Sequence, residues 1–191
     1  IKRTALSAYR NVRKGGIIAI NLEEGDELAW VRNTTGEDDL IIATRQGVAI
    51  RFAESDVRPM GRTATGVRAI RLDEGDEVIA MATCEEGGYL LTVTENGQGR
   101  RTALGEYRTQ NRGGRGVRNY DCEGKGTLVA GVRVVGEEDD VILIADDGII
   151  IRIPCKQIAV QSRYGGGVHA MRLEEGSRVV ALARAPREED D

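Results

Sequence analysis

A loop built from glycine and basic residues spans residues 110–116, where the sequence reads Gln-Asn-Arg-Gly-Gly-Arg-Gly. Two arginines, Arg112 and Arg115, flank its central glycines. Guanidinium groups are forked donors that match the oxygens of a phosphate, and backbone amides in a glycine-rich turn can form an anion-binding nest. We therefore predict that this loop contacts phosphate, with the glycines allowing the backbone to approach the ligand closely.

Copies of this loop recur along the chain with varied sequence. They read Arg13-Lys14-Gly15-Gly16, Arg62 to Gly66, Arg112 to Gly116, and Arg163 to Gly167. For Gly15-Gly16 and Gly165 to Gly167 taken singly, a plain turn without a ligand explains the glycines equally well. The basic side chains favour binding, and the predicted contact residues are Arg13, Lys14, Arg62, Arg68, Gln110, Arg112, Gly113, Gly114, Arg115, Gly116 and Arg163.

Charge is segregated between two kinds of loop, although 27 basic and 31 acidic residues give a net charge of −4. Acids gather in the turns 23–26, 73–76 and 174–176, in 37–39 and 137–140, and in the tail Glu188 to Asp191. Screening at physiological salt weakens charges beyond about 8 Å, so the local field of the basic loops matters more than the sum. Arg51, Arg101 and Arg152 lie on expected strands, where ion pairing with the acidic turns is the favoured interpretation.

The sequence offers no arrangement of catalytic or metal-binding residues. No nucleophile has a basic partner, His169 is the single histidine, and three cysteines without CxxC spacing favour neither zinc nor a disulfide framework. We predict no catalytic residue, metal or cofactor for the chain itself, and a reducing cytoplasm as its location. No apolar run approaches the roughly 20 residues of a membrane helix. Ile1 lies in mid-repeat, which indicates a fragment of a longer protein.

A period of about fifty residues organises the chain. Glycines followed by a β-branched residue stand at Gly16, Gly66, Gly116 and Gly167, in steps of 50, 50 and 51. Each full unit opens with a buried-looking strand pattern, at 40–44, 90–94 and 141–145, and a turn ending in glycine predicts a hairpin into a second strand. A polar segment with helical turns then leads to the basic loop. Third strands are expected at 18–22, 67–72 and 168–173, and fourth strands at 77–82, 128–135 and 178–183.

Four short antiparallel strands per period predict an all-β, propeller-like fold, because radial repetition of such blades leaves little exposed sheet edge. We expect a single domain over residues 1–191, with full blades at 37–86, 87–136 and 137–187, a partial repeat at 1–36 and the acidic tail at 188–191. Regular blades put equivalent loops on one rim. The basic loops should therefore form one continuous surface.

The chain resembles a known family, the C-terminal domain of DNA gyrase A, whose blades form a β-pinwheel. Besides the period, the resemblance rests on Lys2-Arg3-Thr4 and Gly99-Arg100-Arg101-Thr102-Ala103, on Arg58-Pro59-Met60-Gly61 leading to Thr65-Gly66-Val67-Arg68, and on Leu72-Asp73-Glu74-Gly75-Asp76. The family's signature heptapeptide is QRRGGKG. Gln110, Arg112, Gly113, Gly114, Arg115 and Gly116 correspond to it position by position, with Arg115 in place of the lysine, while Asn111 departs from it.

The resemblance implies a module that binds and wraps double-stranded DNA along its basic rim without reading bases, in support of ATP-dependent negative supercoiling. The parent would be a type II topoisomerase of the bacterial nucleoid, with ATP and magnesium used elsewhere in it, and with gyrase B and a second copy of gyrase A as partners. The equivalent domain of topoisomerase IV is the alternative within this class. A protein-interaction propeller that docks a basic partner on its acidic turns is the alternative from another class.

Overall fold

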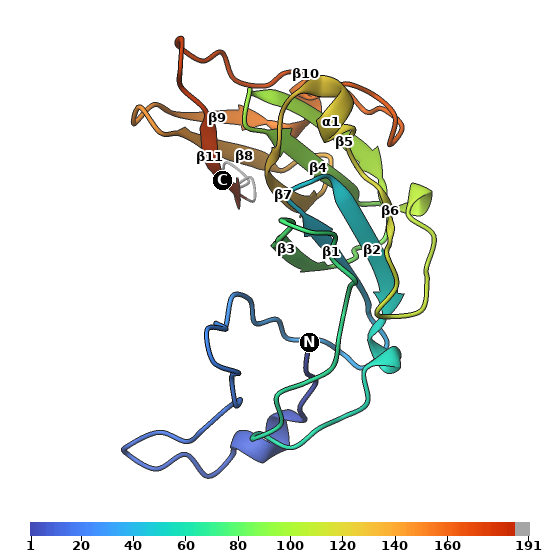
Figure 1. Cartoon of the computed structure of the whole chain (residues 1–191), viewed down its shortest axis with the longest axis vertical. Coiled ribbons are helices and arrows are strands. Elements are labelled where there is room, and N and C mark those ends of the chain that lie inside the picture. The colour runs from blue at the N-terminus through green and yellow to red at the C-terminus, as the bar shows by residue number, and fades with distance from the viewer. Residues whose placement is uncertain (186–191) are drawn as a thin grey trace, which may run out of the picture.

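The computed structural model describes residues 1–185, so the acidic tail 188–191 lies outside the described residues. Three antiparallel sheets follow one another along an arc, and residues 1–36 form irregular loops at one end of it (Figure 1). The strands are β1 (Asp39–Thr44), β2 (Val48–Ala53), β3 (Val78–Thr83), β4 (Tyr89–Thr94), β5 (Gln98–Ala103), β6 (Val117–Arg118), β7 (Val129–Val135), β8 (Asp140–Ala145), β9 (Ile150–Pro154), β10 (Val168–His169) and β11 (Val179–Ala185).

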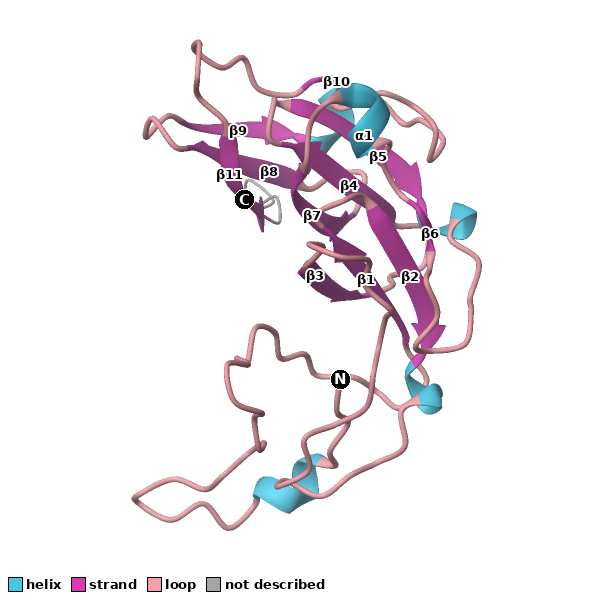
Figure 2. Cartoon of the chain, viewed as in Figure 1, coloured by secondary structure: helices cyan, strands magenta, loops and turns pink. Residues whose placement is uncertain are grey.

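Short helices lie before and between the strands (Figure 2). They are α1 (Cys122–Lys125) and the 3-10 turns η1 (Leu6–Tyr9), η2 (Glu54–Asp56), η3 (Leu104–Glu106) and η4 (Cys155–Gln157). The last three lie in the segments where helical turns are predicted from the sequence. Each follows the second hairpin strand directly, so the basic loop of every full repeat leaves the sheet from the same place.

The predicted hairpins are confirmed in all three full repeats. β1 pairs with β2, β4 with β5 and β8 with β9, each antiparallel. The turn between β1 and β2 ends at Gly47, whose φ of 87° lies in the left-handed region that glycine tolerates. The expected fourth strands are confirmed as well, because β3, β7 and β11 pair with β1, β4 and β8.

The third strand of a repeat belongs to the sheet of the repeat before it. β6 pairs with β2 through Val48–Arg118 and Ala49–Val117, and β10 pairs with β5. Backbone amides of Asn119 and Tyr120 donate to the carbonyl of Gly47 at 2.7 and 2.9 Å, and a Cβ on that glycine would lie 2.3 Å from the carbonyl oxygen of Tyr120. In place of the expected blade made from one repeat, each of the first two sheets combines three strands of one repeat with a strand donated by the next repeat, which we call strand exchange.

Two of the predicted third strands are absent and one is short. Residues 18–22 and 67–72 form no strand, and the segment 168–173 is a strand only at β10. β6 and β10 each pair with the hairpin of the preceding repeat, but residues 1–36 contain no hairpin. The segment 67–72 therefore makes backbone bonds without forming a strand: Val67 and Ile1 exchange hydrogen bonds of 2.9 and 2.7 Å, and the same segment also bonds to the loop at 113–114.

The core lies between successive sheets rather than in one centre. One cluster joins the first two sheets, through residues such as Ile41 and Val132, and a second joins the last two, through residues such as Leu91 and Leu143. A third cluster around Phe52 covers the other face of the first sheet. β1 and β4 are consequently buried along most of their length, whereas β8 alternates between buried and half-buried residues.

Candidate nucleic-acid interface

The basic loops are docked onto the repeat before them by backbone hydrogen bonds. The amide of Gln110 donates to the carbonyl of Arg51, and the amide of Gln161 donates to that of Arg101, both at 2.8 Å. Met60 makes the equivalent bond to Arg3 at 2.8 Å. Three loops therefore begin from the same backbone contact, which fixes where their cations are presented.

An arginine in each of these loops also joins its repeat to the preceding one. Arg62 donates to the carbonyl of Ile18 at 2.7 Å, and Arg163 donates to the carbonyl of Arg118 at 2.7 Å. Arg112 makes the same bond to the carbonyl of Arg68. The three donors and the three acceptors each follow the fifty-residue period. Sequence reasoning missed this contact, although the shared period of the two sets was the signal that could have revealed it.

These loop arginines bond to carbonyl oxygens and not to carboxylates. Among residues 1–185, none of the basic side chains predicted to contact phosphate forms a salt bridge. Asp56 and Glu106 lie close by, yet their carboxylates accept from the backbone amides of Arg112 and Arg163, at 3.4 and 3.1 Å. A carbonyl orients a guanidinium without cancelling its unit charge, so the loops keep their positive field.

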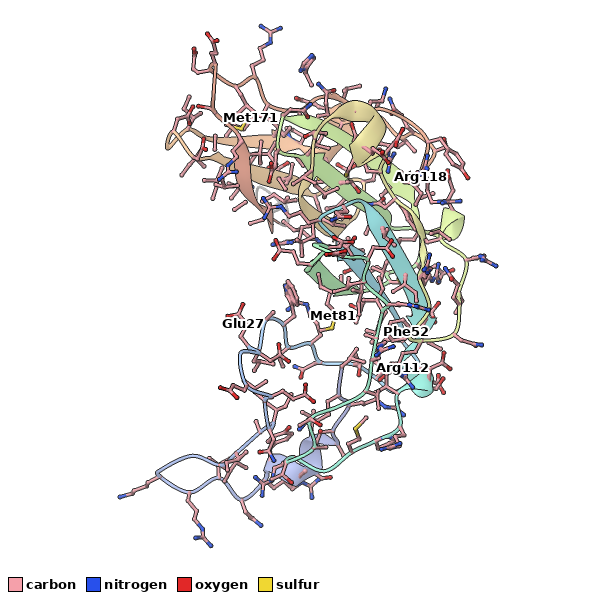
Figure 3. All side chains as sticks on the ribbon, viewed as in Figure 1. Glu27, Phe52, Met81, Arg112, Arg118 and Met171 are labelled. Atoms are coloured by element: carbon pink, nitrogen blue, oxygen red, sulfur yellow. The ribbon has the colours of Figure 1, made fainter. Side chains whose placement is uncertain are left out.

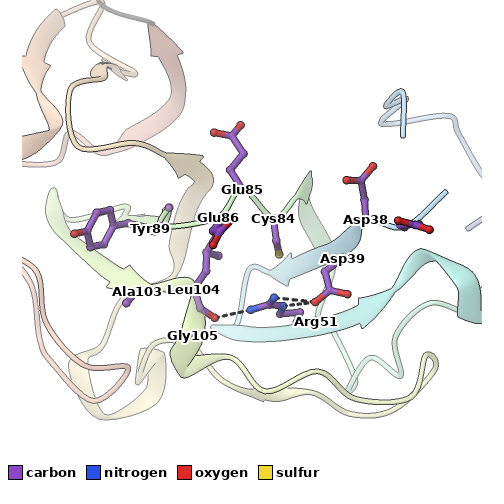
Figure 4. Close-up of a pocket in the computed structure, with 13 residues that line it drawn as sticks. Asp38, Asp39, Arg51, Cys84, Glu85, Glu86, Tyr89, Ala103, Leu104 and Gly105 are labelled. Carbon is purple, nitrogen blue, oxygen red and sulfur yellow. Dashed lines mark hydrogen bonds and ion pairs between the residues drawn. The ribbon is translucent and has the colours of Figure 1, made fainter. Parts of the chain in front are cut away.

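The strand arginines behave in the opposite way, as the ion-pairing interpretation predicts. Arg101 pairs with Glu137 at 3.1 Å, and Arg152 pairs with Asp140 at 2.8 Å. Arg51 pairs with Asp39 at 2.8 Å and donates to the carbonyl of Leu104 at 3.0 Å, in a pocket between two sheets (Figure 4). These cations are neutralised locally, and the bond from Arg51 to Leu104 also joins two successive repeats.

Four of the predicted contact residues, Arg13, Lys14, Arg68 and Arg115, are exposed, and their side chains have no partner among the described residues. Figure 3 shows Arg112 and Arg118 on the outer, convex edge of the arc, whereas Glu27 lies toward its open side. Arg163 bonds to the backbone carbonyl of Arg118 and Arg112 to that of Arg68, so each of these loop arginines lies against the backbone of the preceding repeat. The predicted contact residues offer charge to a ligand without first breaking ion pairs, whereas Arg118 pairs with Asp121 at 3.9 Å.

The glycines of the loop at 110–116 have a structural role in addition to any role in ligand binding. Gly113 donates to the carbonyl of Ala69 at 2.7 Å, and the carbonyl of Gly114 accepts from Arg71 at 2.9 Å. Gly116 has a φ of 78°, and a Cβ there would lie 2.5 Å from the carbonyl oxygen of Ala49. Gln110 keeps a buried side-chain amide nitrogen without a partner. The motif therefore secures strand exchange at the same place where it displays Arg115.

Other titratable groups form no catalytic cluster in the part of the chain that the structure describes. His169 is exposed and contacts Gln98, and no three acidic, histidine or cysteine side chains among residues 1–185 are placed to hold a metal ion. Burial raises the pKa of Cys84, Cys122 and Cys155 to about 11, which leaves little thiolate at neutral pH. No helix within residues 1–185 is long and apolar enough to cross a membrane.

Successive antiparallel sheets that exchange strands, with unneutralised arginines along one edge, define a propeller-like repeat domain with a cationic rim. The chain belongs to the DNA gyrase C-terminal domain family, because the family model described as "DNA gyrase C-terminal domain, beta-propeller" matches residues 1–35, 38–85, 88–135 and 139–186. The resemblance stated from the sequence and the predicted fold class are thus confirmed.

Similar proteins agree with this assignment. The chain is 60% identical over 190 residues to the DNA gyrase A protein of Halalkalibacterium halodurans and 49% identical over 191 residues to that of Clostridium acetobutylicum, and in both cases all of this chain and 23% of the relative are covered. The chain thus spans about a quarter of the length of these relatives.

Two solved structures share the fold. The C-terminal domain of DNA topoisomerase IV matches with a TM-score of 0.88 and 27% identity, over 96% of this chain and 58% of that one. A DNA gyrase A C-terminal domain matches with a TM-score of 0.80 and 26% identity, over 90% and 59%. The topoisomerase IV alternative is thus close in fold, while the higher identities are to the gyrase A proteins.

Proposed function

We propose that the chain binds double-stranded DNA along its convex basic edge and bends it without reading bases. The observation that carries this proposal is that Arg62, Arg112 and Arg163 keep their charge, since each bonds to a carbonyl of the preceding repeat instead of a carboxylate. Phosphates along a duplex would replace no existing ion pair on binding. Displacement of condensed counterions from the DNA would then supply most of the affinity.

The arc gives a reason for bending. The basic loops of the three full repeats lie on the outer edge of the arc, so a duplex that contacts several of them must follow the curve. Bending a site of 20 to 30 base pairs costs on the order of 1 to 6 kcal/mol on smooth elastic estimates. Contacts distributed over several loops offset that cost, whereas a single loop would bind a straight duplex.

In the parent protein, we propose that wrapping presents one DNA segment to another with fixed handedness and so supports negative supercoiling by a gyrase. DNA cleavage, and the use of ATP and magnesium, are assigned to other parts of gyrase A and to gyrase B. The proposed partners are double-stranded DNA, gyrase B and a second copy of gyrase A, in the cytoplasm at the bacterial nucleoid. The names of the gyrase A relatives support this proposal.

A gel-shift titration of the chain with duplex DNA across a salt series tests the binding step. The double variant Arg112→Glu and Arg115→Glu should bind more weakly and with a flatter dependence on salt, because two phosphate contacts are replaced by repulsion. Unchanged affinity and slope would remove the loop from the binding surface. Deleting all of residues 1–191 from the parent protein should abolish supercoiling but keep relaxation. Retained supercoiling would contradict the wrapping step.

A further inference from the structure

Arg100 is a fully buried cation that no carboxylate contacts. It lies in the middle of β5, its exposed fraction is 0%, and none of the salt bridges among residues 1–185 includes it. Taking a guanidinium out of water without a counterion is costly unless hydrogen bonds compensate. A hydrophobic residue at this position would avoid the cost. The cost therefore indicates that the charge and hydrogen bonds of Arg100 have a role of their own.

The hydrogen bonds of Arg100 go to the basic loop of the following repeat and to Asn119 of its own repeat. One terminal nitrogen donates to the carbonyls of Arg163 and Gly165, at 2.9 and 2.8 Å. The other donates to the carbonyl and the side-chain oxygen of Asn119. Beside it, the hydroxyl of Tyr120 donates to the carbonyl of Gly166 at 2.7 Å. Three carbonyls of the loop are therefore turned inward, toward Arg100 and Tyr120.

Inward carbonyls turn the next amides outward. A trans peptide places its carbonyl and N–H on opposite sides, and the described chain has no cis peptide bond. The amides of Tyr164 and Gly166 therefore face away from Arg100, and that of Gly166 has no acceptor among the described residues. The guanidinium of Arg163 bonds to the carbonyl of Arg118 and lies 5.2 Å from the ring centroid of Tyr164. Outward amides next to a cation form a cradle for one phosphate group.

The position equivalent to Arg100 is cationic in some repeats and apolar in others. Lys2 precedes Arg3 as Arg100 precedes Arg101, and its ammonium donates to the carbonyls of Arg62 and Ala19. In the second and fourth repeats the position is held by Ile50 and Ile151. A cation thus lies beneath the loops of Arg62 and Arg163, whereas the loop of Arg112 rests near an isoleucine.

We propose that Arg100 is a positioning residue for phosphate binding, and that its hydrogen bonds orient the loop 161–167 so that the amide of Gly166 and the side chain of Arg163 hold one phosphate of the duplex. This inference rests on the proposed function. The loop at 161–167 differs in this respect from the loop at 110–116, which lies near Ile50 and, among residues 1–185, has no cation beneath it.

Two variants of Arg100 test the proposal. Arg100→Ile copies the residue of two sister repeats, so it should fold, but it should weaken binding of a short duplex about tenfold, the size of one lost charge-assisted hydrogen bond. Arg100→Lys copies Lys2 and should restore most of the affinity. A loss in Arg100→Ile that lysine does not rescue, or wild-type affinity in Arg100→Ile, would overturn the proposal.

A second measurement needs no variant to fold. In the wild-type chain, NMR should show the amide signal of Gly166 shifting on addition of a 12-base-pair duplex. A duplex that binds without moving that signal contradicts the cradle while leaving DNA binding intact. A duplex that does not bind the wild-type chain at all contradicts the proposed function, and the two failures are thereby distinguished.

Discussion

The guanidinium of Arg163 donates to the carbonyl oxygen of Arg118 at 2.7 Å, across 45 positions of sequence. The same residue lies over two aromatic rings, 6.0 Å from the centroid of Tyr107 and 5.2 Å from that of Tyr164. One side chain therefore both joins two repeats and presents charge on the outer edge. Other arginines of the chain have only one of these two roles, either holding the fold together or presenting charge.

Replacing Arg163 should affect stability and binding together. Arg163→Gln removes the bond to Arg118 and one cation, so we expect the free energy of unfolding to fall by about 1 kcal/mol and the slope of log affinity against log salt to lose about 0.9. Urea unfolding and a salt series of gel shifts measure the two effects. A variant that lost stability but kept its salt slope would exclude Arg163 from phosphate contact.

Arg115 should affect binding alone, because it is exposed and its side chain has no partner among residues 1–185. For Arg115→Gln we expect an unfolding free energy within about 0.5 kcal/mol of wild type, together with a salt slope lower by about 0.9. Arg152→Gln is the matched control, since Arg152 is neutralised by Asp140 on a strand. Equal slopes for the two variants would refute the distinction.

Arg101 should affect stability alone. It is 3% exposed, donates to the carbonyl of Ile158 at 2.8 Å, pairs with Glu137 and stacks 4.9 Å from the ring centroid of Tyr89. Arg101→Met leaves that carbonyl unsatisfied, so a loss of about 2 kcal/mol is expected. The salt slope of DNA binding, measured under conditions where the variant is folded, should stay at its wild-type value. A flatter slope would place Arg101 on the DNA.

Gly116 should tolerate no side chain. An alanine Cβ would lie 2.5 Å from the carbonyl of Ala49 at a φ of 78°, so Gly116→Ala should cost about 1 to 3 kcal/mol in unfolding free energy. Gly105→Ala is the control, because a Cβ there meets nothing within 4 Å. Thermal unfolding of both variants checks the difference. Similar melting temperatures would mean that strand exchange does not depend on this close approach.

Alkaline pH should destabilise the chain through its buried thiols. Burial raises the pKa of Cys84, Cys122 and Cys155 from 9.0 to about 11 in the folded state. The unfolded chain then loses these protons first, so the contribution of the thiols to stability is complete below pH 9 and is lost as pH rises toward 11. Urea midpoints from pH 7 to 11 should fall less steeply in a variant with all three cysteines changed to alanine. Parallel curves would exclude the thiols as the cause.

Much of this architecture is determined by local sequence. The hairpins at Gly47 and Gly97 follow from short β-branched runs and turn glycines, which act over a few residues. The period, and the placing of acids and bases in alternate loops, can also be read directly from the linear sequence. These features, together with the family resemblance, were enough to predict the blades and to name the loop arginines.

Tertiary structure decided which strand pairs with which hairpin and which arginines remain charged. Because the repeats are alike, a strand such as β6 has the same pattern whether it joins its own sheet or the preceding one, and only packing selects β2. Arg101 and Arg163 are likewise the same residue type, yet one lies against Glu137 and the other against the carbonyl of Arg118. Their partners come from residues 36 and 45 positions away, and sequence spacing does not fix distances on that scale.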